Sequence, residues 1–211
     1  HEGGYSTFRV DITEALADEN VLAVSADNSD NEIVYPQKAD FTFYGGIYRP
    51  VKLIGVPAGH FTLDYHGGPG IKVTPEIKGD TAEVKVEAWI TGDASEVEFA
   101  VRGSDQADDR ALTEKVPVVG GKAEAVFVIE NVHLWDGLED PYLYQAKSSL
   151  DTREAVATKF VSRTFSLYPE KGCCFNGSSS PLYGSARHPA RQPVGHHHPP
   201  PYTTAATATA R

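Results

Sequence analysis

The fold of the first part of this chain is decided by the stretch Ala39-Asp-Phe-Thr-Phe-Tyr-Gly-Gly-Ile-Tyr-Arg-Pro-Val51. Aromatic residues alternate there with small or polar ones up to the pair Gly45-Gly46, and Ile47 resumes the apolar pattern. This pattern predicts two strands that meet at a tight bend or bulge, where glycine lets the backbones approach closely. The carboxylate of Asp40 is expected at the mouth of that bend.

Short apolar stretches separated by turn-forming residues precede this bend. Residues 8–12 alternate apolar with charged side chains, and residues 21–24 read Val-Leu-Ala-Val, so both are predicted strands. Between them a single helical turn is predicted, capped by Thr13. So few strands cannot close a sandwich. Residues 1–60 are therefore expected to be the later part of a domain, with apolar faces and sheet edges left open.

The next hundred residues have the spacing of an all-β sandwich. Short apolar stretches are separated by Gly-rich turns, and about seven strands in about 105 residues is typical of an immunoglobulin-like domain. The predicted strands are residues 71–73, 82–90, 96–101, 123–129, 142–149 and 155–165. Trp89 and Trp135 are expected to pack in the core or at a domain interface, and stacking on a sugar is the alternative.

Four segments resemble those of a known family, in the order in which that family has them. They are residues 1–28, the Asp40 segment with its Gly-Gly-Ile-Tyr-Arg sequence, Leu134-Trp…Pro-Tyr-Leu-Tyr144, and Phe175-Asn-Gly177 with Gly184…Arg187-His188. The family is glycoside hydrolase family 2, which includes β-galactosidases and β-glucuronidases. The first two segments resemble its sugar-binding jelly roll. The third resembles its immunoglobulin-like domain, and the fourth resembles the segment that opens its (β/α)₈ barrel.

This resemblance implies an all-β fold in three parts. Residues 1–60 would be the C-terminal part of the sugar-binding jelly roll, a partial galactose-binding-like sheet. Residues 61–167 would be the immunoglobulin-like β-sandwich, and residues 168–211 a degenerate start of the barrel with a disordered C-terminal tail. The His-, Pro-, Thr- and Ala-rich sequence after Gly195 cannot bury enough apolar surface to order itself. Altered residues at preserved spacing after about Gly172 suggest a damaged reading frame, which sequencing of the coding region would test.

The catalytic residues of the family are expected to lie elsewhere. A retaining glycosidase needs two carboxyl groups about 5 to 5.5 Å apart. The family places both, as glutamates, late in a barrel of roughly 250 residues, for which residues 168–211 are too few. Asn31-Glu32 has the form of the acid/base dipeptide, but it lies in a turn-rich loop and is assigned no catalytic role.

The sequence therefore predicts a non-catalytic N-terminal fragment of a family 2 enzyme. By the resemblance, its parent would hydrolyse terminal β-galactosides with retention of configuration. The parent could instead be a β-glucuronidase or a β-mannosidase, because these share the architecture. A stand-alone carbohydrate-binding or scaffold module without catalysis is the alternative from another class.

Two positions match substrate-binding residues of the family. Asp40 matches the aspartate that reaches the active site of β-galactosidase-like members, where it contacts galactosyl hydroxyls and a sodium ion. A carboxylate suits both roles, although it could instead accept hydrogen bonds from the Gly45-Gly46 backbone. His188 matches the histidine at the end of the first barrel strand, which donates to the substrate. Its neighbours Tyr183 and Ala186 depart from the pattern, so an exposed tail histidine is the alternative.

The resemblance also implies sodium and magnesium for the parent enzyme, and no cofactor is expected within this chain. With 19 basic and 29 acidic residues the formal charge is −10, which disfavours a nucleic-acid partner. There is no apolar run of about 18 residues, so no membrane span is predicted, and no signal-peptide pattern is visible at the start of the sequence.

The chain contains only two cysteines, Cys173 and Cys174. Adjacent Cα atoms are only about 3.8 Å apart, so these residues are not expected to bridge each other. Two such residues build neither a disulfide framework nor a four-ligand zinc site, which suits the cytoplasm. The absence of Met suggests a piece of a longer product. Surface left open by the truncated first domain would favour association or aggregation of this chain. For the parent enzyme, a homo-oligomer is a separate expectation.

Overall fold

The computed structural model describes residues 1–3, 6–34, 45–47, 49–105, 107, 110–151 and 153–179. The chain divides into two compact units, one of residues 1–54 with 184–211 and the other of Gly55–Tyr183. Asp40, His188 and the predicted tail after Gly195 lie outside the described residues. Within the described part of the chain, no helix is both long and apolar enough to cross a membrane.

The described residues of the first unit contain one short 3₁₀ turn, η1 (Thr13–Ala15), and no strand. The predicted helical turn therefore exists, but the predicted cap by Thr13 is wrong. Ile12 precedes the turn without a side-chain cap, and the Thr13 hydroxyl donates to the Asp11 carboxylate at 2.6 Å. Val21 is 98% exposed, so residues 21–24 are not packed as a jelly-roll strand in this structure. Leu22 and Val24 are exposed as well, and no described residue pairs with this segment as a strand.

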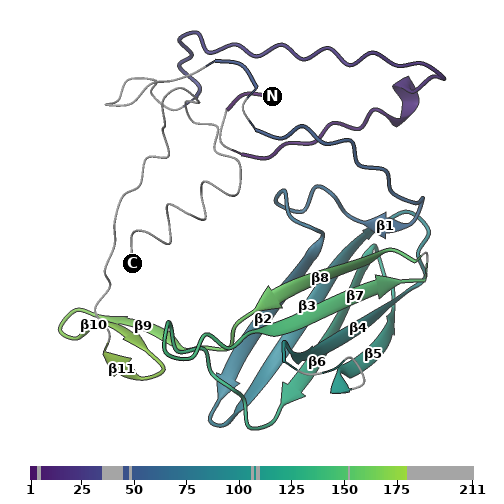
Figure 1. The fold of residues 1–211 in the computed structure, drawn as a ribbon. Helices are drawn as coiled ribbons and strands as arrows, with labels where there is room; N and C mark the ends of the chain where they lie inside the picture. Colours follow the sequence, from purple (N-terminus) through teal and green to yellow (C-terminus); the bar gives the residue numbers. More distant parts are fainter. Residues whose placement is uncertain are drawn as a thin grey trace. The chain divides into compact units, whose positions relative to one another are not determined.

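The second unit contains two four-stranded antiparallel sheets that pack on each other as a sandwich (Figure 1). This confirms the predicted all-β class. In the first sheet the central strand β3 (Thr81–Thr91) pairs with β2 (Ile71–Lys78), β6 (Lys122–Ile129) and β1 (His60–Phe61). The second sheet has the order β5 (Leu112–Pro117), β4 (Glu96–Gly103), β7 (Tyr144–Leu150) and β8 (Ala155–Phe160).

The core lies between the two sheets and follows the period-2 alternation of the strands. In β3, Val84 and Val86 are fully buried, whereas Lys85 and Glu87 lie on the outer face. Phe99 of β4, also fully buried, reaches the same core from the other sheet. Each strand thus presents alternate side chains to the interior, as a half-buried antiparallel sheet requires.

A small third sheet follows the sandwich (Figure 1). Its strands, in the order β11-β10-β9, are β9 (Phe165–Tyr168), β10 (Gly172–Phe175) and β11 (Ser178–Ser179). The predicted strand 155–165 is therefore two elements, β8 in the sandwich and the start of β9 in the small sheet. Cys173 and Cys174, side by side on β10, are both buried and unbridged, so the prediction that they form no disulfide is confirmed.

The segment that enters the sandwich is held closely against it at Gly92. This residue has φ +84°, and a Cβ added there would overlap the carbonyl oxygen of Ala58. Thr62 N–H donates to the Trp89 carbonyl at 2.8 Å, and Phe61 N–H donates to Glu154 Oε2 at 2.7 Å. Glycine is needed at position 92 both for its backbone conformation and for the space that the entering chain occupies.

Replacing Gly92 with alanine should therefore destabilise the sandwich by about 3 kcal/mol, from a strained φ together with steric overlap. Gly79→Ala is the matched control, because Gly79 has φ +69° but a Cβ there would meet nothing within 4 Å. The control should lose only about 1 kcal/mol. Urea unfolding monitored by circular dichroism measures both losses, and equal losses would contradict a close approach at Gly92.

Candidate functional site

The loop between β6 and β7, residues 130–143, carries most of the Leu-Trp…Pro-Tyr-Leu-Tyr signature and is called the Trp135 loop below. Its base is held by Tyr144, the first residue of β7, which is 4% exposed. The backbone N–H of His133 donates to the Tyr144 hydroxyl at 2.8 Å. A buried tyrosine whose hydroxyl binds backbone earlier in the chain is a feature of immunoglobulin-like sandwiches. Tyr144 thus fixes the start of the loop to the strand that follows it.

A second tyrosine of the signature braces the loop from the side. The ring of Tyr142 is stacked on the His133 ring, with centroids 3.9 Å apart and planes 5° apart. Its hydroxyl donates to Asp105 Oδ1 at 2.5 Å, and Asp105 follows β4. His133 Nε2 lies 2.6 Å from Asp140 Oδ2, within the same loop. These polar and aromatic contacts form one cluster, which ties the Trp135 loop to the connection that follows β4.

The electrostatics of this cluster follow from these contacts. The hydrogen bond from Tyr142 holds the pKa of the Asp105 carboxyl below its ordinary value. Burial first, and then the bond to Asp105, raise the pKa of the Tyr142 hydroxyl. Each shift favours the protonation state in which tyrosine donates and aspartate accepts. A general acid needs the opposite perturbation, a raised carboxyl pKa, so the cluster is suited to holding the loop in place.

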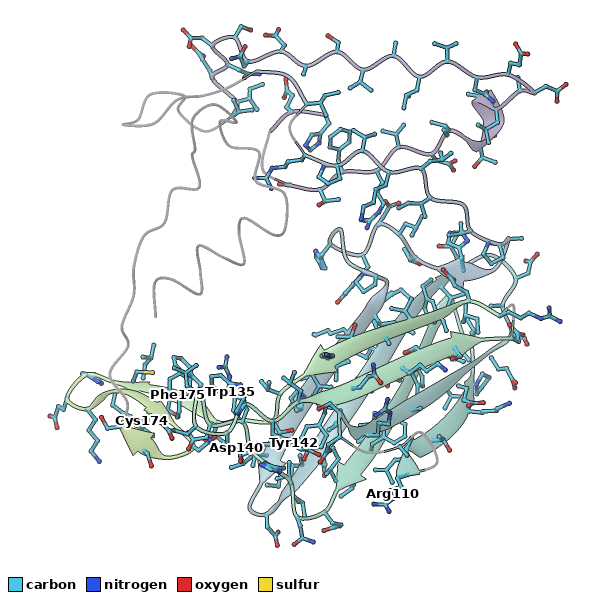
Figure 2. All side chains as sticks on the ribbon, in the orientation of Figure 1. Arg110, Trp135, Asp140, Tyr142, Cys174 and Phe175 are labelled. Carbon is cyan, nitrogen blue, oxygen red and sulfur yellow. The ribbon has the colours of Figure 1, made fainter. Side chains whose placement is uncertain are left out.

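Trp135 lies where the sandwich meets the small sheet, near Phe175 of β10 (Figure 2). The backbone N–H of Trp135 donates to the Ser162 carbonyl at 2.9 Å. The guanidinium of Arg163 lies 4.9 Å from the centroid of the Trp135 ring and 5.5 Å from that of Phe175. The two rings meet edge to face at 6.1 Å. Trp135 therefore packs at an interface, as predicted, and one cation is shared by two aromatic faces.

Asn176 completes the junction between the loop and the small sheet. Its Nδ2 donates to the Trp135 carbonyl at 2.9 Å, and its Oδ1 accepts from Thr164 N–H at 3.1 Å. Its own N–H donates to the Thr164 carbonyl at 3.1 Å. We call this set of three hydrogen bonds the Asn176 latch. It joins two segments of the family-like sequence that lie about forty residues apart in the chain.

The backbone of the latch is a two-residue hairpin turn. Asn176 and Gly177 lie between the paired residues Phe175 and Ser178 of β10 and β11. Their φ values, +47° and +82°, are both in the left-handed region. A tight hairpin turn of type I′ needs positive φ at both positions, and Asn-Gly is its preferred sequence. The local sequence thus dictates the turn that aims the Asn176 amide at the loop.

Trp89, the second predicted aromatic, lies on the outer face of β3 and is not a core residue. Its ring is stacked on Tyr65 at 3.8 Å with planes 14° apart. Lys122 Nζ lies 5.5 Å from the Trp89 centroid and also bonds Glu87 at 2.7 Å. One face of the indole is thus covered by the protein itself, which disfavours the alternative role of stacking on a sugar.

Sequence reasoning did not anticipate several of these residues. Asp105 and Arg163 are ordinary polar residues whose partners lie in other elements, and His133 contacts Tyr142 and Asp140 within its own loop, which no sequence pattern indicates. The Asn-Gly pair, however, lies between two short β-like stretches and could have been interpreted as a hairpin turn. In the described residues, no group of three or more His, Cys, Asp or Glu side chains converges as a metal site. Asp40 and His188 lie outside the described residues.

Comparisons with known proteins place this arrangement in a family context. Residues 69–165 match the model of "Glycosyl hydrolases family 2". The chain is 30% identical to a β-glucuronidase of Bacteroides fragilis, over 92% of this chain and 30% of that protein. It is 26% identical to the β-galactosidase large subunit of Leuconostoc lactis, over 89% of this chain and 29% of that subunit.

A solved structure shares the fold. The crystal structure of a Bacteroides uniformis β-glucuronidase matches with a TM-score of 0.70 and 25% identity. The match covers 82% of this chain and 22% of that one. The present chain thus spans less than a third of the length of these relatives.

The Tyr142–Asp105 hydrogen bond generates a prediction for stability against pH. Because the pKa of Asp105 is lowered in the folded state, the stability it contributes is present above its ordinary pKa of 3.8. That contribution is lost as the pH falls through the folded value. Tyr142→Phe removes the donor. The free energy of unfolding that it loses relative to the unsubstituted chain should therefore be largest near neutral pH and shrink below about pH 4.

Urea unfolding midpoints between about pH 7 and about pH 3 measure this difference. Tyr65→Phe is the control, because the Tyr65 ring is also stacked on another ring, that of Trp89. The difference in unfolding midpoint between Tyr65→Phe and the unsubstituted chain should stay constant over that range. A Tyr142→Phe deficit that is equally constant would contradict a role for Asp105 ionisation.

Proposed function

The sandwich of this chain belongs to glycoside hydrolase family 2, and from that premise we propose that the chain is a non-catalytic part of a retaining β-glycosidase. The observation that carries the proposal is the match of 92% of the chain to an enzyme of which it spans only 30%. Retaining hydrolysis needs an acid/base and a nucleophilic carboxyl group facing each other. A barrel of roughly 250 residues that carries them would fit within the remaining length of such a relative.

In this proposal the contribution of the chain is mechanical. The Trp135 loop is braced by Tyr142 and Tyr144, and the Asn176 latch ties it to the small sheet. The sandwich and the small sheet therefore form a stiff support on which an adjoining catalytic domain could be held. Positioning of this kind matters because small misplacements of reacting groups are costly in rate.

Substrate contacts in this proposal come from the two residues identified by resemblance. Asp40 would accept hydrogen bonds from sugar hydroxyls in the completed active site, and His188 would donate to the substrate. A carboxylate at Asp40 would also suit a sodium ion, because hard cations prefer oxygen ligands. Neither residue performs bond cleavage. Both bind and orient the sugar that another domain would cleave.

Two sugars are candidates for the substrate of the parent enzyme. The Asp40 segment resembles that of β-galactosidase-like members, which supports a terminal β-galactoside. The relatives named β-glucuronidase, however, reach 30% and 29% identity, against 26% for the Leuconostoc lactis β-galactosidase subunit. This ordering favours a β-glucuronide as the second candidate. No observation on the chain favours a β-mannoside.

Fragment complementation tests the proposal. The chain alone should hydrolyse neither 4-nitrophenyl β-galactoside nor 4-nitrophenyl β-glucuronide. Mixed with a Bacteroides fragilis β-glucuronidase that lacks the aligned segment, it should restore turnover of one of them. Asp40→Ala should lower the restored kcat/KM by about a hundredfold, since losing a carboxylate that bonds the substrate leaves sugar hydroxyls unpaired.

Asp64→Ala, at an exposed carboxylate of the second unit, is the control and should leave the restored rate unchanged. Turnover by the chain alone would refute the non-catalytic assignment. If the mixture stays inactive while calorimetry detects binding of a free sugar to the chain, the alternative of a stand-alone carbohydrate-binding module would replace the proposal.

A further inference from the structure

Asn176 is the only asparagine of the 211-residue chain that is followed by glycine. This pair is chemically unusual, because a residue without a side chain leaves its backbone nitrogen open to attack the preceding side-chain amide. Gly177 is exposed, and a Cβ built there would meet nothing within 4 Å. Gly177 is therefore accessible from solvent, and the half-buried Asn176 directly precedes it in the chain.

We propose that Asn176 is a site of spontaneous deamidation, and that loss of its amide releases the small sheet from the Trp135 loop. The inference does not depend on the proposed function. It rests on the Asn-Gly sequence, on the exposed Gly177 and on the three hydrogen bonds of the latch.

The chemical step balances with water as the only co-reactant. The Gly177 backbone nitrogen attacks Cγ of Asn176, the new C–N bond closes a succinimide, and the Cγ–Nδ2 bond breaks. The proton of the Gly177 nitrogen leaves with Nδ2, which departs as ammonia. Water then adds to either carbonyl of the ring and opens it, so that position 176 becomes aspartate or isoaspartate.

The folded latch opposes this reaction. The Asn176 Nδ2 and Oδ1 are both engaged, with the Trp135 carbonyl and the Thr164 N–H. The positive φ values of the turn also hold the backbone in one conformation. The ring can close only when the latch has opened, so the rate of deamidation in the folded chain follows the population of that open state.

The product cannot rebuild the latch. A carboxylate oxygen would replace the Nδ2 donor and face the Trp135 carbonyl, which is itself an acceptor. The isoaspartate form also adds a methylene to the backbone of a two-residue turn, whose geometry admits no extra atom. The new charge would lie one residue from Phe175, whose ring shares the Arg163 guanidinium with Trp135. Each change weakens the contact between the Trp135 loop and the small sheet.

The test is peptide mapping by mass spectrometry of the full chain after incubation at mildly alkaline pH, folded and in urea. Asn176 should convert to aspartate and isoaspartate in both, and about tenfold or more slowly in the folded chain, because two hydrogen bonds must open first. Asn131 is an internal control in the same digest. It has a similar φ of +48°, but the β-branched Val132 follows it, so it should remain intact.

Equal rates of deamidation in the folded and unfolded chain would contradict the protection of Asn176 by the latch. An intact Asn176 in unfolded chain would overturn the modification site itself. Trp135→Phe leaves the Trp135 carbonyl in place and weakens only the ring contacts. It should accelerate deamidation in the folded chain while leaving the rate in urea unchanged.

A second measurement reports the consequence of the modification. Asn176→Asp should increase quenching of tryptophan fluorescence by acrylamide, because Trp135 loses its partner at the junction. Asn176→Gln is the control, because it replaces the same side chain but keeps an uncharged amide that can donate a hydrogen bond. If Asn176→Asp leaves the quenching at the level of the unsubstituted chain, deamidation does not release the small sheet, and the proposed consequence of the modification is wrong.

Discussion

The hydrogen bond from the Asn176 amide to the Trp135 carbonyl connects two parts of this chain that also meet through the rings of Trp135 and Phe175. One part is a long loop of the sandwich, and the other is a hairpin too small to be stable on its own. The Arg163 guanidinium lies over the rings of both Trp135 and Phe175 and adds a third contact between these parts. The Asn176 latch, the paired rings and the Arg163 guanidinium together join the small sheet to the sandwich.

The sandwich itself follows from patterns that are local in the sequence. The alternation of apolar and charged residues in β3 predicts its buried and outer faces directly, and the structure has both. Strand β5 was not predicted, because it lies at a sheet edge where most of its residues are exposed and no alternation marks it. The Thr13 cap failed because its hydroxyl donates to the Asp11 carboxylate, while the N–H groups of Ala15 and Leu16 donate to backbone carbonyls.

The contacts of the candidate site could not be predicted in the same way. Trp135, Tyr142 and Tyr144 were picked out as a family-like motif, but the motif does not indicate what each side chain contacts. Their partners Asp105, Ser162 and Asn176 are brought to them by strand pairing across the fold. The motif is therefore explained by the structure as three anchors of one loop, two tyrosines at its base and side and a tryptophan at the junction.

Among the described residues, these contacts hold the Trp135 loop in place. The perturbed carboxyl group of the cluster is held ionised, and the aromatic rings are occupied by partners from the same chain. These contacts support the proposal that the chain is a non-catalytic part of an enzyme whose chemistry needs two opposed carboxyl groups.

The most direct test is to locate the nucleophile in an active chimera. The aligned segment of the Bacteroides fragilis β-glucuronidase would be replaced by this chain, and the covalent glycosyl-enzyme would be trapped with a slow fluorinated substrate and mapped by mass spectrometry. The account predicts a label on a carboxylate outside the present 211 residues. A label on any residue of this chain would contradict it.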